Sequence, residues 1–223
     1  MNAERPALKK AIIFDCDGVL LDSMPYYYKA WSVAFATQGI TLSKDEFYER
    51  EGEQRTKSVK EIFEKSTGHN PSARVSEEII NTMRDTFFKS FKPKLFPCTR
   101  ELLMALVKKH NMLGLVTGSE SLAEMFGPES DLLSLFNTVV TGPETKEGKP
   151  APEPYEQAIQ RLSLPRSCCY AVENAPLGIQ SAKAARLFCF AVRNTSPISA
   201  SKLKRAGADV VCDSNKELMR WLV

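Results

Sequence analysis

The sequence lacks the long apolar runs and the charge imbalance that would place it in a membrane or on nucleic acid. It has no run of about 18 apolar residues, which argues against a membrane-spanning helix. Its first residues, MNAERPALKK, have no apolar segment of the kind that a signal peptide needs. With 30 basic and 27 acidic residues the net charge is only +3, and the basic stretches KPK and KLKR are short. We therefore expect neither a membrane nor a nucleic acid as a partner.

The chain also has few of the patterns that bind zinc or form disulfides. Its six cysteines show no CxxC spacing, and the adjacent Cys168 and Cys169 would point to opposite faces of a strand. Reduced, mostly buried thiols are the better interpretation, and they favour a cytoplasmic protein. Nothing in the sequence indicates an obligate protein partner.

Short apolar runs alternate with helical patterns through most of the chain. The predicted strands lie at 11–14, 112–119, 137–142, 168–174, 187–192 and 208–214. The predicted helices between them lie at 100–109, 121–136, 152–162, 178–185 and 216–221. Strands that are apolar on both faces and alternate with helices predict an α/β fold with a parallel sheet covered on both sides. Ligands of such sheets bind beyond the carboxyl ends of the strands.

One region of the chain departs from this alternation. Between about residues 25 and 92 there is no strand-like run, and helical patterns cover 26–38, 44–51, 58–66 and 77–91. This pattern predicts a second, smaller domain inserted after the first strand. We therefore assign residues 1–24 and 93–223 to the α/β core and residues 25–92 to a helical cap. Its linkers, near 22–25 and 92–97, would let the cap open and close over the strand ends.

The first predicted strand runs directly into two carboxylates. In FDCDG, Asp15 and Asp17 follow the apolar run and Gly18 lets the chain turn. Such a pair can bind a divalent cation through hard oxygen ligands. One carboxylate can instead attack an electrophile while the other moves a proton. A third alternative is that an aspartate caps the following helix.

Three further strand ends carry residues suited to phosphate and metal chemistry. The LVTGS run ends in hydroxyls and a glycine, GKPAPEPY places Lys149 on a stiff segment, and a fourth run ends in Glu173 and Asn174. Hydroxyls and an ammonium group would hold phosphoryl oxygens, and the acidic groups would hold a cation. Together the four strand ends predict a site for a phosphate and Mg²⁺, with Asp15 free to attack phosphorus.

The segments FDCDGVLLDS, VTGS, GKPAPEPY and VENAPLGI resemble, in order, the four motifs of the haloacid dehalogenase superfamily. The position of the helical insert is similar to that in the branch containing β-phosphoglucomutase and phosphoglycolate phosphatase. The resemblance implies a Rossmann-like parallel-sheet core with an inserted α-helical cap domain. It also implies Mg²⁺ as the cofactor.

The same resemblance implies roles for individual residues. Asp15 would be the nucleophile that forms an aspartyl-phosphate. Asp17 would be the general acid and base, with its backbone carbonyl on the metal. Thr117 and Lys149 would bind the transferred phosphoryl group. Gly18 would permit the turn that lets Asp17 move.

The implied metal and substrate sites include residues of both core and cap. The residues expected to bind Mg²⁺ are Asp15, Asp17, Glu173, Asn174 and Glu51. Those expected to bind substrate are Gly18, Gly118, Ser119 and Arg55. The family usually has an aspartate where this chain has Asn174, and Glu51 in EREGEQR is the candidate that would compensate. ENAPLG, together with DSMP and the EG of the cap, resembles members that hydrolyse inorganic pyrophosphate.

We therefore predict a Mg²⁺-dependent phosphohydrolase that acts on a small phosphorylated metabolite or on pyrophosphate. A sugar phosphomutase is the first alternative, because Arg55 stands where β-phosphoglucomutase has an arginine for a second phosphate. Tyr27 and Glu120 weigh against it, since the mutase has a histidine and a lysine at those places. The other alternative is an inactive fold that serves as a binding or regulatory module, which Asn174 would mark.

Overall fold

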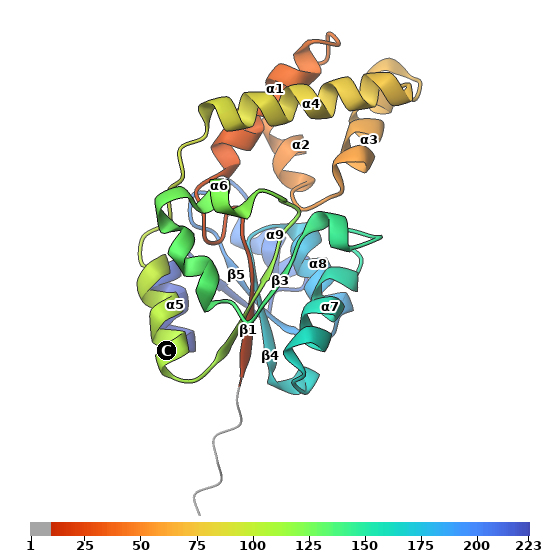
Figure 1. Cartoon of the computed structure of the whole chain (residues 1–223). Helices are drawn as coiled ribbons and strands as arrows, with labels where there is room; N and C mark the ends of the chain where they lie inside the picture. Colours follow the sequence, from red (N-terminus) through yellow and green to blue (C-terminus); the bar gives the residue numbers. More distant parts are fainter. Residues whose placement is uncertain (1–9) are drawn as a thin grey trace, which may run out of the picture.

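The computed structural model describes residues 10–223 and contains one six-stranded sheet. Figure 1 shows this sheet with helices on both sides and further helices beyond one end. All strand pairs are parallel, and the spatial order is β3-β2-β1-β4-β5-β6. The strands are β1 (Ala11–Asp15), β2 (Met112–Val116), β3 (Thr138–Val140), β4 (Cys169–Glu173), β5 (Phe188–Val192) and β6 (Val210–Cys212). The predicted α/β class with a parallel sheet is confirmed.

Helices cover both faces of the sheet. On one face α5 packs against β2 and α10 against β5 and β6, while on the other α7 packs against β2 and β3 and α8 against β4 and β5 (Figure 1). The core helices are α5 (Thr99–Lys108), α6 (Leu122–Phe126), α7 (Glu153–Leu162), α8 (Pro176–Ala184), α9 (Ala200–Arg205) and α10 (Asn215–Leu222). Short 3₁₀ helices cover Gly127–Leu135, Gly142–Glu144 and Arg166–Cys168.

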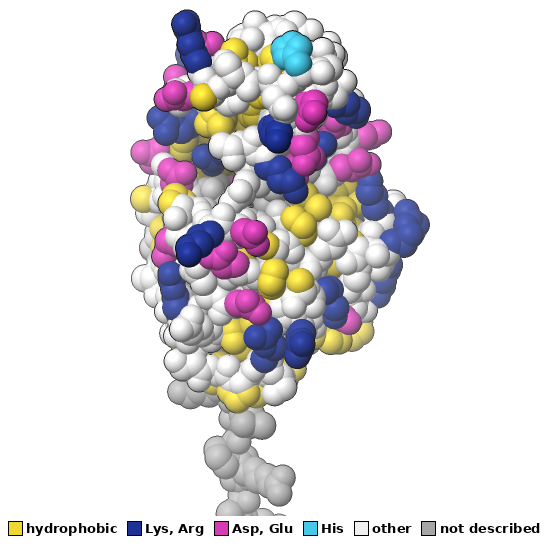
Figure 2. Space-filling view, turned by 90° about the vertical axis from the view of Figure 1, so that its right-hand side faces the viewer, with side chains coloured by type: hydrophobic (Ala, Val, Ile, Leu, Met, Phe, Trp, Pro, Cys, Tyr) yellow, Lys and Arg dark blue, Asp and Glu magenta, His cyan; other side chains and the backbone are white. Residues whose placement is uncertain are grey.

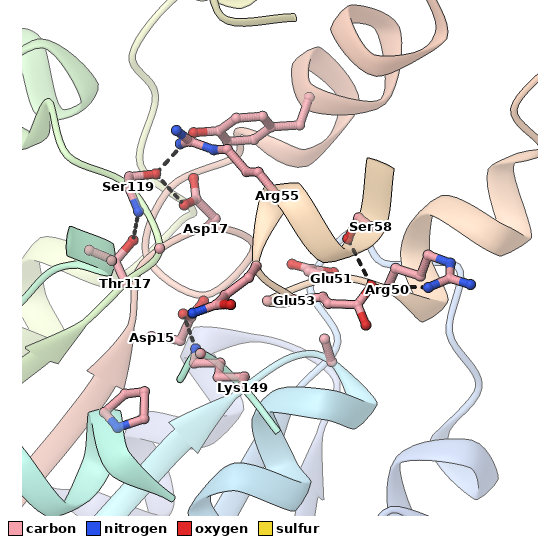
Figure 3. A pocket seen from close by; sticks show the side chains of 18 of the residues that line it. Asp15, Asp17, Arg50, Glu51, Glu53, Arg55, Ser58, Thr117, Ser119 and Lys149 are labelled. Carbon is pink, nitrogen blue, oxygen red and sulfur yellow. Dashed lines mark hydrogen bonds and ion pairs between the residues drawn. The ribbon is translucent and has the colours of Figure 1, made fainter. Parts of the chain in front are cut away.

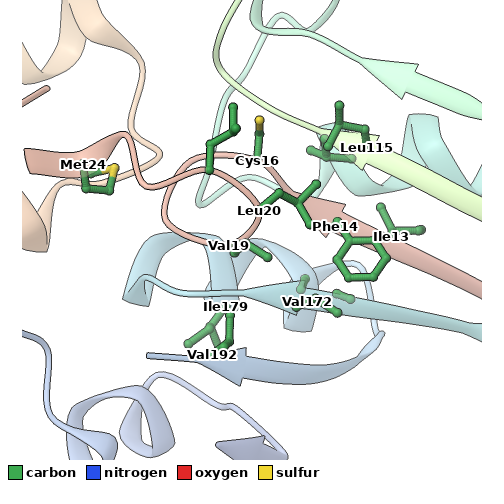
Figure 4. Packing of buried hydrophobic residues seen from close by; sticks show 14 of the residues in the cluster. Ile13, Phe14, Cys16, Val19, Leu20, Met24, Leu115, Val172, Ile179 and Val192 are labelled. Carbon is green, nitrogen blue, oxygen red and sulfur yellow. The ribbon is translucent and has the colours of Figure 1, made fainter. Parts of the chain in front are cut away.

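The central strand β1 is buried along its whole length. It lies between β2 and β4 and pairs with β2 over 11–15 and with β4 over 11–14, and helices cover both faces of the sheet. Figure 4 shows Ile13 and Phe14 among Leu115, Val172 and other apolar side chains of the core. Such a position favours an apolar run, because burying one large aliphatic or aromatic side chain stabilises the folded state by about 1.5–3 kcal/mol. The strand therefore holds the residues at its carboxyl end in a fixed place.

Two predicted elements differ from the structure. The helix predicted over 121–136 ends at Phe126 and continues as a 3₁₀ helix. Gly127 has a positive φ of 50°, and Pro128 after it has no N–H and clashes with the preceding turn, so the α-helix cannot continue. Helix α9 was not predicted, since it has only six residues and one buried side chain, Leu203.

Four helices lie between β1 and α5, over the carboxyl ends of the strands (Figure 1). We call them the helical insert: α1 (Met24–Ala36), α2 (Lys44–Glu49), α3 (Arg55–Thr67) and α4 (Ala73–Ser90). Helices α1 and α4 pack closely, and the rings of Tyr27 and Phe87 stack with their centroids 3.9 Å apart. The helical content predicted for this region is thus present, and the division at residues 25–92 into a separate domain stays a prediction.

The two connections to the helical insert run side by side. The Asp22 amide donates to the Lys94 carbonyl at 2.9 Å, and the Phe96 amide donates to the Leu20 carbonyl at 3.0 Å. Leu21 and Leu95 form an antiparallel bridge between these bonds. The insert therefore leaves and re-enters the core at one point.

No helix within residues 10–223 has the length and apolar character needed to cross a membrane. All six cysteines lie in this range; none is disulfide-bonded, and four of them are buried. Figure 2 shows lysine and arginine side chains interspersed with aspartate and glutamate over the face in view.

Candidate active site

A cavity of about 570 Å³ lies between the carboxyl ends of the strands and the helical insert (Figure 3). Strand ends and the loops after them form its floor, and α1 to α4 contribute its walls. The structure brings nearly all the predicted site residues to this cavity: Asp15, Asp17, Glu51, Arg55, Thr117, Gly118, Ser119, Lys149, Glu173 and Asn174. Gly18, which was also predicted to bind substrate, does not line the cavity.

Lys149 joins the two acidic residues of the floor. Its Nζ lies 2.5 Å from Asp15 Oδ1 and 2.6 Å from Glu173 Oε1, and all three side chains are buried. Burial alone would lower the pKa of Lys149, but the two carboxylates outweigh it and raise that pKa above its usual value. Burial raises the pKa of Asp15 to about 8, although Lys149 opposes the shift. The ammonium group therefore stays charged and orients the Asp15 carboxylate.

Asp17 is held by two hydroxyl groups. Ser23 Oγ donates to Asp17 Oδ1 at 2.5 Å. Ser119 Oγ donates to Asp17 Oδ2 at 3.0 Å, as Figure 3 shows. Burial raises the pKa of Asp17 above its ordinary value, and these two hydrogen bonds oppose the shift. Tyr27 Oη of α1 lies 2.9 Å from Ser119 Oγ, so the helical insert reaches Asp17 through one hydroxyl. A carboxyl group with a raised pKa that is held in place by hydrogen bonds is a candidate for proton transfer.

The turn after β2 presents hydroxyl and backbone groups to the same space. The Ser119 amide donates to Thr117 Oγ1 at 3.1 Å, which fixes the Thr117 side chain, and the Thr117 amide donates to the Val140 carbonyl at 3.0 Å. Gly118 has no atom within 4 Å of the position a Cβ would take. Its backbone is therefore open toward a ligand, as an anion-binding turn requires.

Asn174 and Glu51 meet across the boundary between core and insert. Asn174 Nδ2 donates to Glu51 Oε1 at 2.5 Å, and both side chains are buried. The other oxygens of the pair, Glu51 Oε2 and Asn174 Oδ1, have no hydrogen-bond partner. A Cβ at Gly18, whose φ is +77°, would stand 2.0 Å from Asn174 Nδ2. Only a glycine therefore lets the β1 loop approach this pair.

The two unpartnered oxygens bear on whether the site fits a metal ion. Buried polar atoms nearly always have partners, and a carboxylate and an amide oxygen are hard donors of the kind that Mg²⁺ prefers. Within the described residues, no group of three or more His, Cys, Asp and Glu side chains is arranged to hold a metal by itself. One predicted donor is the amide of Asn174, and Lys149 already bonds to Asp15 and Glu173. The donor chemistry thus fits a divalent cation only when the amide is counted.

Among the predicted metal ligands, Glu173 already has protein partners on both of its carboxylate oxygens. Its Oε1 accepts hydrogen bonds from Tyr155 Oη at 2.6 Å and from Lys149, and its Oε2 accepts one from the backbone amide of Asn174 at 3.3 Å. In this structure the carboxylate positions Lys149. Its role as a metal ligand stays a prediction.

Arg55 lines the cavity from the start of α3. Its guanidinium lies 3.7 Å from the Glu120 carboxylate, so a charge of the opposite sign stands beside it. Deeper in the wall, Glu53 accepts from Ser58 at 2.8 Å and from Arg50 at 3.0 Å (Figure 3). Arg50 and Glu53 therefore compensate each other within the insert, and Arg55 is compensated by Glu120 from the turn after β2.

Sequence reasoning missed several residues that position this site. Ser23 follows Asp17 by six residues within the first motif, and Tyr155 follows Lys149 by six within the third. Both residues could have been identified from their positions within these motifs. Asn215 gave none: its Nδ2 donates to the Val19 carbonyl at 2.9 Å and so braces the turn after Asp17 from the far end of the chain.

A parallel sheet that gathers carboxylates, hydroxyls and a buried lysine at the carboxyl ends of neighbouring strands defines an α/β enzyme of the hydrolase type. The model of the family described as haloacid dehalogenase-like hydrolase matches residues 12–192. The chain belongs to this family.

Comparison with individual proteins gives the same result. A solved structure, "Putative beta-phosphoglucomutase from Bacteroides vulgatus", superposes with a TM-score of 0.86 at 31% identity and covers 96% of this chain and 87% of that one. Fructose-1-phosphate phosphatase YqaB of Escherichia coli is 28% identical over 82% of this chain and 95% of its own. Protein SUPPRESSOR OF QUENCHING 1, chloroplastic, of Arabidopsis thaliana is 30% identical over 91% of this chain, which spans only 19% of that relative.

Proposed function

We propose that this protein is a Mg²⁺-dependent phosphohydrolase that acts on a small phosphorylated metabolite or on pyrophosphate through an aspartyl-phosphate. The observation that carries the proposal is the pairing of the buried Asp15 with Lys149 at 2.5 Å, two residues from a second, half-buried carboxylate, Asp17. One group is oriented for attack and the other is placed for proton transfer. The family membership and the phosphatase name of the Escherichia coli relative support the proposal.

The residues of the chain divide the reaction between them. Asp15 attacks phosphorus and the leaving-group oxygen takes a proton from Asp17, after which Asp17 removes a proton from the water that hydrolyses the acyl-phosphate. Thr117 and the Gly118 backbone hold phosphoryl oxygens, and Lys149 balances their charge. Enclosure by the helical insert excludes bulk water and strengthens these interactions.

Mg²⁺ would be held by Asp15, Asp17, Glu51 and Asn174, with Glu173 beside them. When bound it supplies positive charge to the phosphoryl oxygens and favours the ionised form of Asp15. The unpartnered oxygens of Glu51 and Asn174 support this assignment. Because Asn174 is neutral, Glu51 would provide the charge that an aspartate at that place would otherwise supply.

The pairing of Arg55 with Glu120 favours hydrolysis over phosphoryl return to a sugar. A phosphomutase must hold a second phosphate on its substrate, which needs net positive charge at that place. Here the Glu120 carboxylate lies 3.7 Å from Arg55 and would repel such a group. We keep the mutase as the second candidate because the Bacteroides vulgatus structure carries that description.

The unbonded cysteines support our proposal of a cytoplasmic location.

The test is release of inorganic phosphate from a panel of phosphate monoesters and pyrophosphate, with Mg²⁺ and with EDTA. The proposal expects Mg²⁺-dependent release that the Asp15→Asn variant lacks. Turnover no greater than that of Asp15→Asn would instead indicate an inactive binding module. Conversion of β-glucose 1-phosphate to glucose 6-phosphate with a bisphosphate primer, in place of free phosphate, would identify a mutase.

A further inference from the structure

The cavity extends beyond the phosphate site into the helical insert, and its far part is apolar. Asp15, Thr117 and Lys149 lie at the floor formed by the strand ends, and the charged groups of the insert, such as Arg55 and Glu53, lie in the wall next to it. The apolar residues of the insert that line the same cavity come from all four helices and the segment before α2: Met24, Trp31, Leu42, Phe47, Ile62 and Ile80. None of them takes part in the chemistry assigned to the floor.

The helical spacing of the lining residues shows how the wall changes along its length. On α3 the lining residues Arg55, Ser58 and Ile62 are three and four positions apart, so they share one face of the helix. On α1 the same spacing relates Tyr27 and Trp31. Seven residues of helix span about 10 Å. The wall therefore passes from charged to apolar over a distance of about 10 Å from Arg55.

The charged part of this wall carries little unbalanced charge toward the cavity. Arg55 faces Glu120, and Arg50 bonds to Glu53. Because each of these charges already has a partner of opposite sign, an uncharged leaving group can lie next to both pairs. Beyond them, Trp31, Phe47 and Ile62 offer only apolar contact, apart from the indole N–H.

The size of the cavity also exceeds what a phosphate or pyrophosphate fills. About 570 Å³ falls in the range of roughly 300–1,000 Å³ that pockets for organic ligands occupy. Water in an apolar recess makes few hydrogen bonds, so its replacement by apolar atoms is favourable. A pyrophosphate would leave this recess to water, whereas an ester with an apolar leaving group would fill it.

We propose that the apolar recess formed by Trp31, Phe47, Ile62 and their neighbours binds the leaving group of the substrate. The substrate class is then an organic phosphate monoester whose uncharged leaving group carries an aliphatic or aromatic portion, rather than pyrophosphate or a bisphosphate. This inference rests on the proposed function, because it takes the floor of the cavity to be the phosphoryl site.

The test is the binding of n-alkyl phosphonates, from methyl to octyl, to the whole protein with Mg²⁺ by isothermal titration calorimetry. The phosphonate head is the same throughout and is not hydrolysed, so binding is measured without turnover. Each methylene that enters the recess is expected to lower Kd by about fourfold, until the recess is full. A Kd that does not change with chain length, while methylphosphonate binds, overturns the inference and leaves the proposed function standing.

Variants locate the effect in the recess. Ile80→Thr and Ile62→Thr, which alter lining residues, are expected to reduce the fold-change per methylene and to leave the Kd of methylphosphonate unchanged. Ile79→Thr is the matched control, because Ile79 is fully buried beside Ile80 but does not line the cavity. An equal loss of slope in Ile79→Thr overturns the assignment, and if the lining variants do not fold, the wild-type series still decides.

Turnover separates the two proposals. n-Alkyl phosphates longer than propyl have nearly equal leaving-group reactivity, so kcat/KM is expected to rise with chain length in parallel with phosphonate affinity. Failure of methylphosphonate and inorganic phosphate to bind, with no ester hydrolysed, would refute the proposed function and the inference together. Hydrolysis of short esters with no gain for longer ones would refute the inference alone.

Discussion

Replacing Asn174 by aspartate tests the contact between core and insert most directly. In the wild type, Asn174 Nδ2 donates to Glu51 Oε1 at 2.5 Å, and neither side chain is exposed. Asn174→Asp removes the donor and sets a second carboxyl group against the first. Without a metal ion, the folded protein must then either keep a proton on the pair or accept two like charges in contact.

The size of the effect follows from the separation and the burial. Two unit charges about 4 Å apart at an effective dielectric constant of about 20 repel by about 4 kcal/mol, or about three pKa units. Burial already raises the pKa of Glu51 well above its usual value. A carboxyl group whose pKa is higher in the folded than in the unfolded state stabilises the fold at low pH and loses that contribution as pH rises. We therefore expect Asn174→Asp to lose about 4 kcal/mol at pH 8 in EDTA and progressively less toward pH 5.

The assay is urea denaturation at pH 5, 6, 7 and 8, with EDTA and with Mg²⁺. The control is the double variant Glu51→Gln/Asn174→Asp, which exchanges the charge and the amide and restores one hydrogen bond. It should recover most of the lost stability. Mg²⁺ should stabilise Asn174→Asp more than the wild type and should be needed at a lower concentration for half-maximal activity. Wild-type stability of Asn174→Asp at pH 8 in EDTA, or no recovery in the double variant, would refute the reasoning.

Three further predictions concern the floor of the site. Lys149→Met leaves the buried Asp15 and Glu173 carboxylates without a counter-charge, so the free energy of unfolding should fall by about 3–5 kcal/mol at pH 8 and less at pH 5, as denaturation curves would show; an equal loss at both pH values would contradict this. Gly18→Ala should lower both Tm and phosphate release, because a Cβ there meets other atoms at 2.0 Å. Gly39→Ala, with a similar φ of +71° and open space around it, should cost only the backbone term of about 1–2 kcal/mol, and equal effects of the two would rule out the close approach. In metal-free wild type, the raised pKa of Asp15, about 8, means that stability falls from pH 5 to pH 8; Mg²⁺ should therefore raise Tm more at pH 8 than at pH 6, and a shift independent of pH would oppose metal contact with Asp15.

Much of the fold could be predicted because its strands are buried on both faces. Strands β1, β2, β4 and β5 appear in the sequence as nearly continuous apolar runs, since most of their positions are buried between the helices on the two faces of the sheet. Short elements were less predictable. Helix α9 has six residues and one buried side chain, too few for a helical pattern to stand out from that of a loop, whereas the three-residue strand β6 lies within the predicted strand at 208–214. The α-helix ends after Phe126 because of two residues, Gly127 and Pro128, and a helical pattern read over many residues does not reveal the effect of two.

The candidate site shows the same division between local and distant information. Asp15 ends β1, and Asp17 and Thr117 follow β1 and β2 closely, so the parallel topology alone brings these three residues to one edge. Lys149 lies in the longer connection between β3 and α7. The contact between Asn174 and Glu51 depends on how the helical insert sits over the core, and no spacing along the chain contains that arrangement. Glu51 was indicated only by resemblance, and its pairing with the Asn174 amide required the structure.

The paired connections at Asp22 and Lys94 have a consequence for how this protein can change. Because the insert leaves and re-enters at one place, joined by hydrogen bonds of 2.9 Å and 3.0 Å, its two ends are as close as those of a hairpin. The entropic cost of closing a loop grows only slowly with the number of residues in the loop. A different lid, or none, can therefore be grafted between these two points without asking β1 or its neighbours to move. Recombination at this junction would exchange substrate preference as one portable unit while the reacting carboxylates are inherited unchanged.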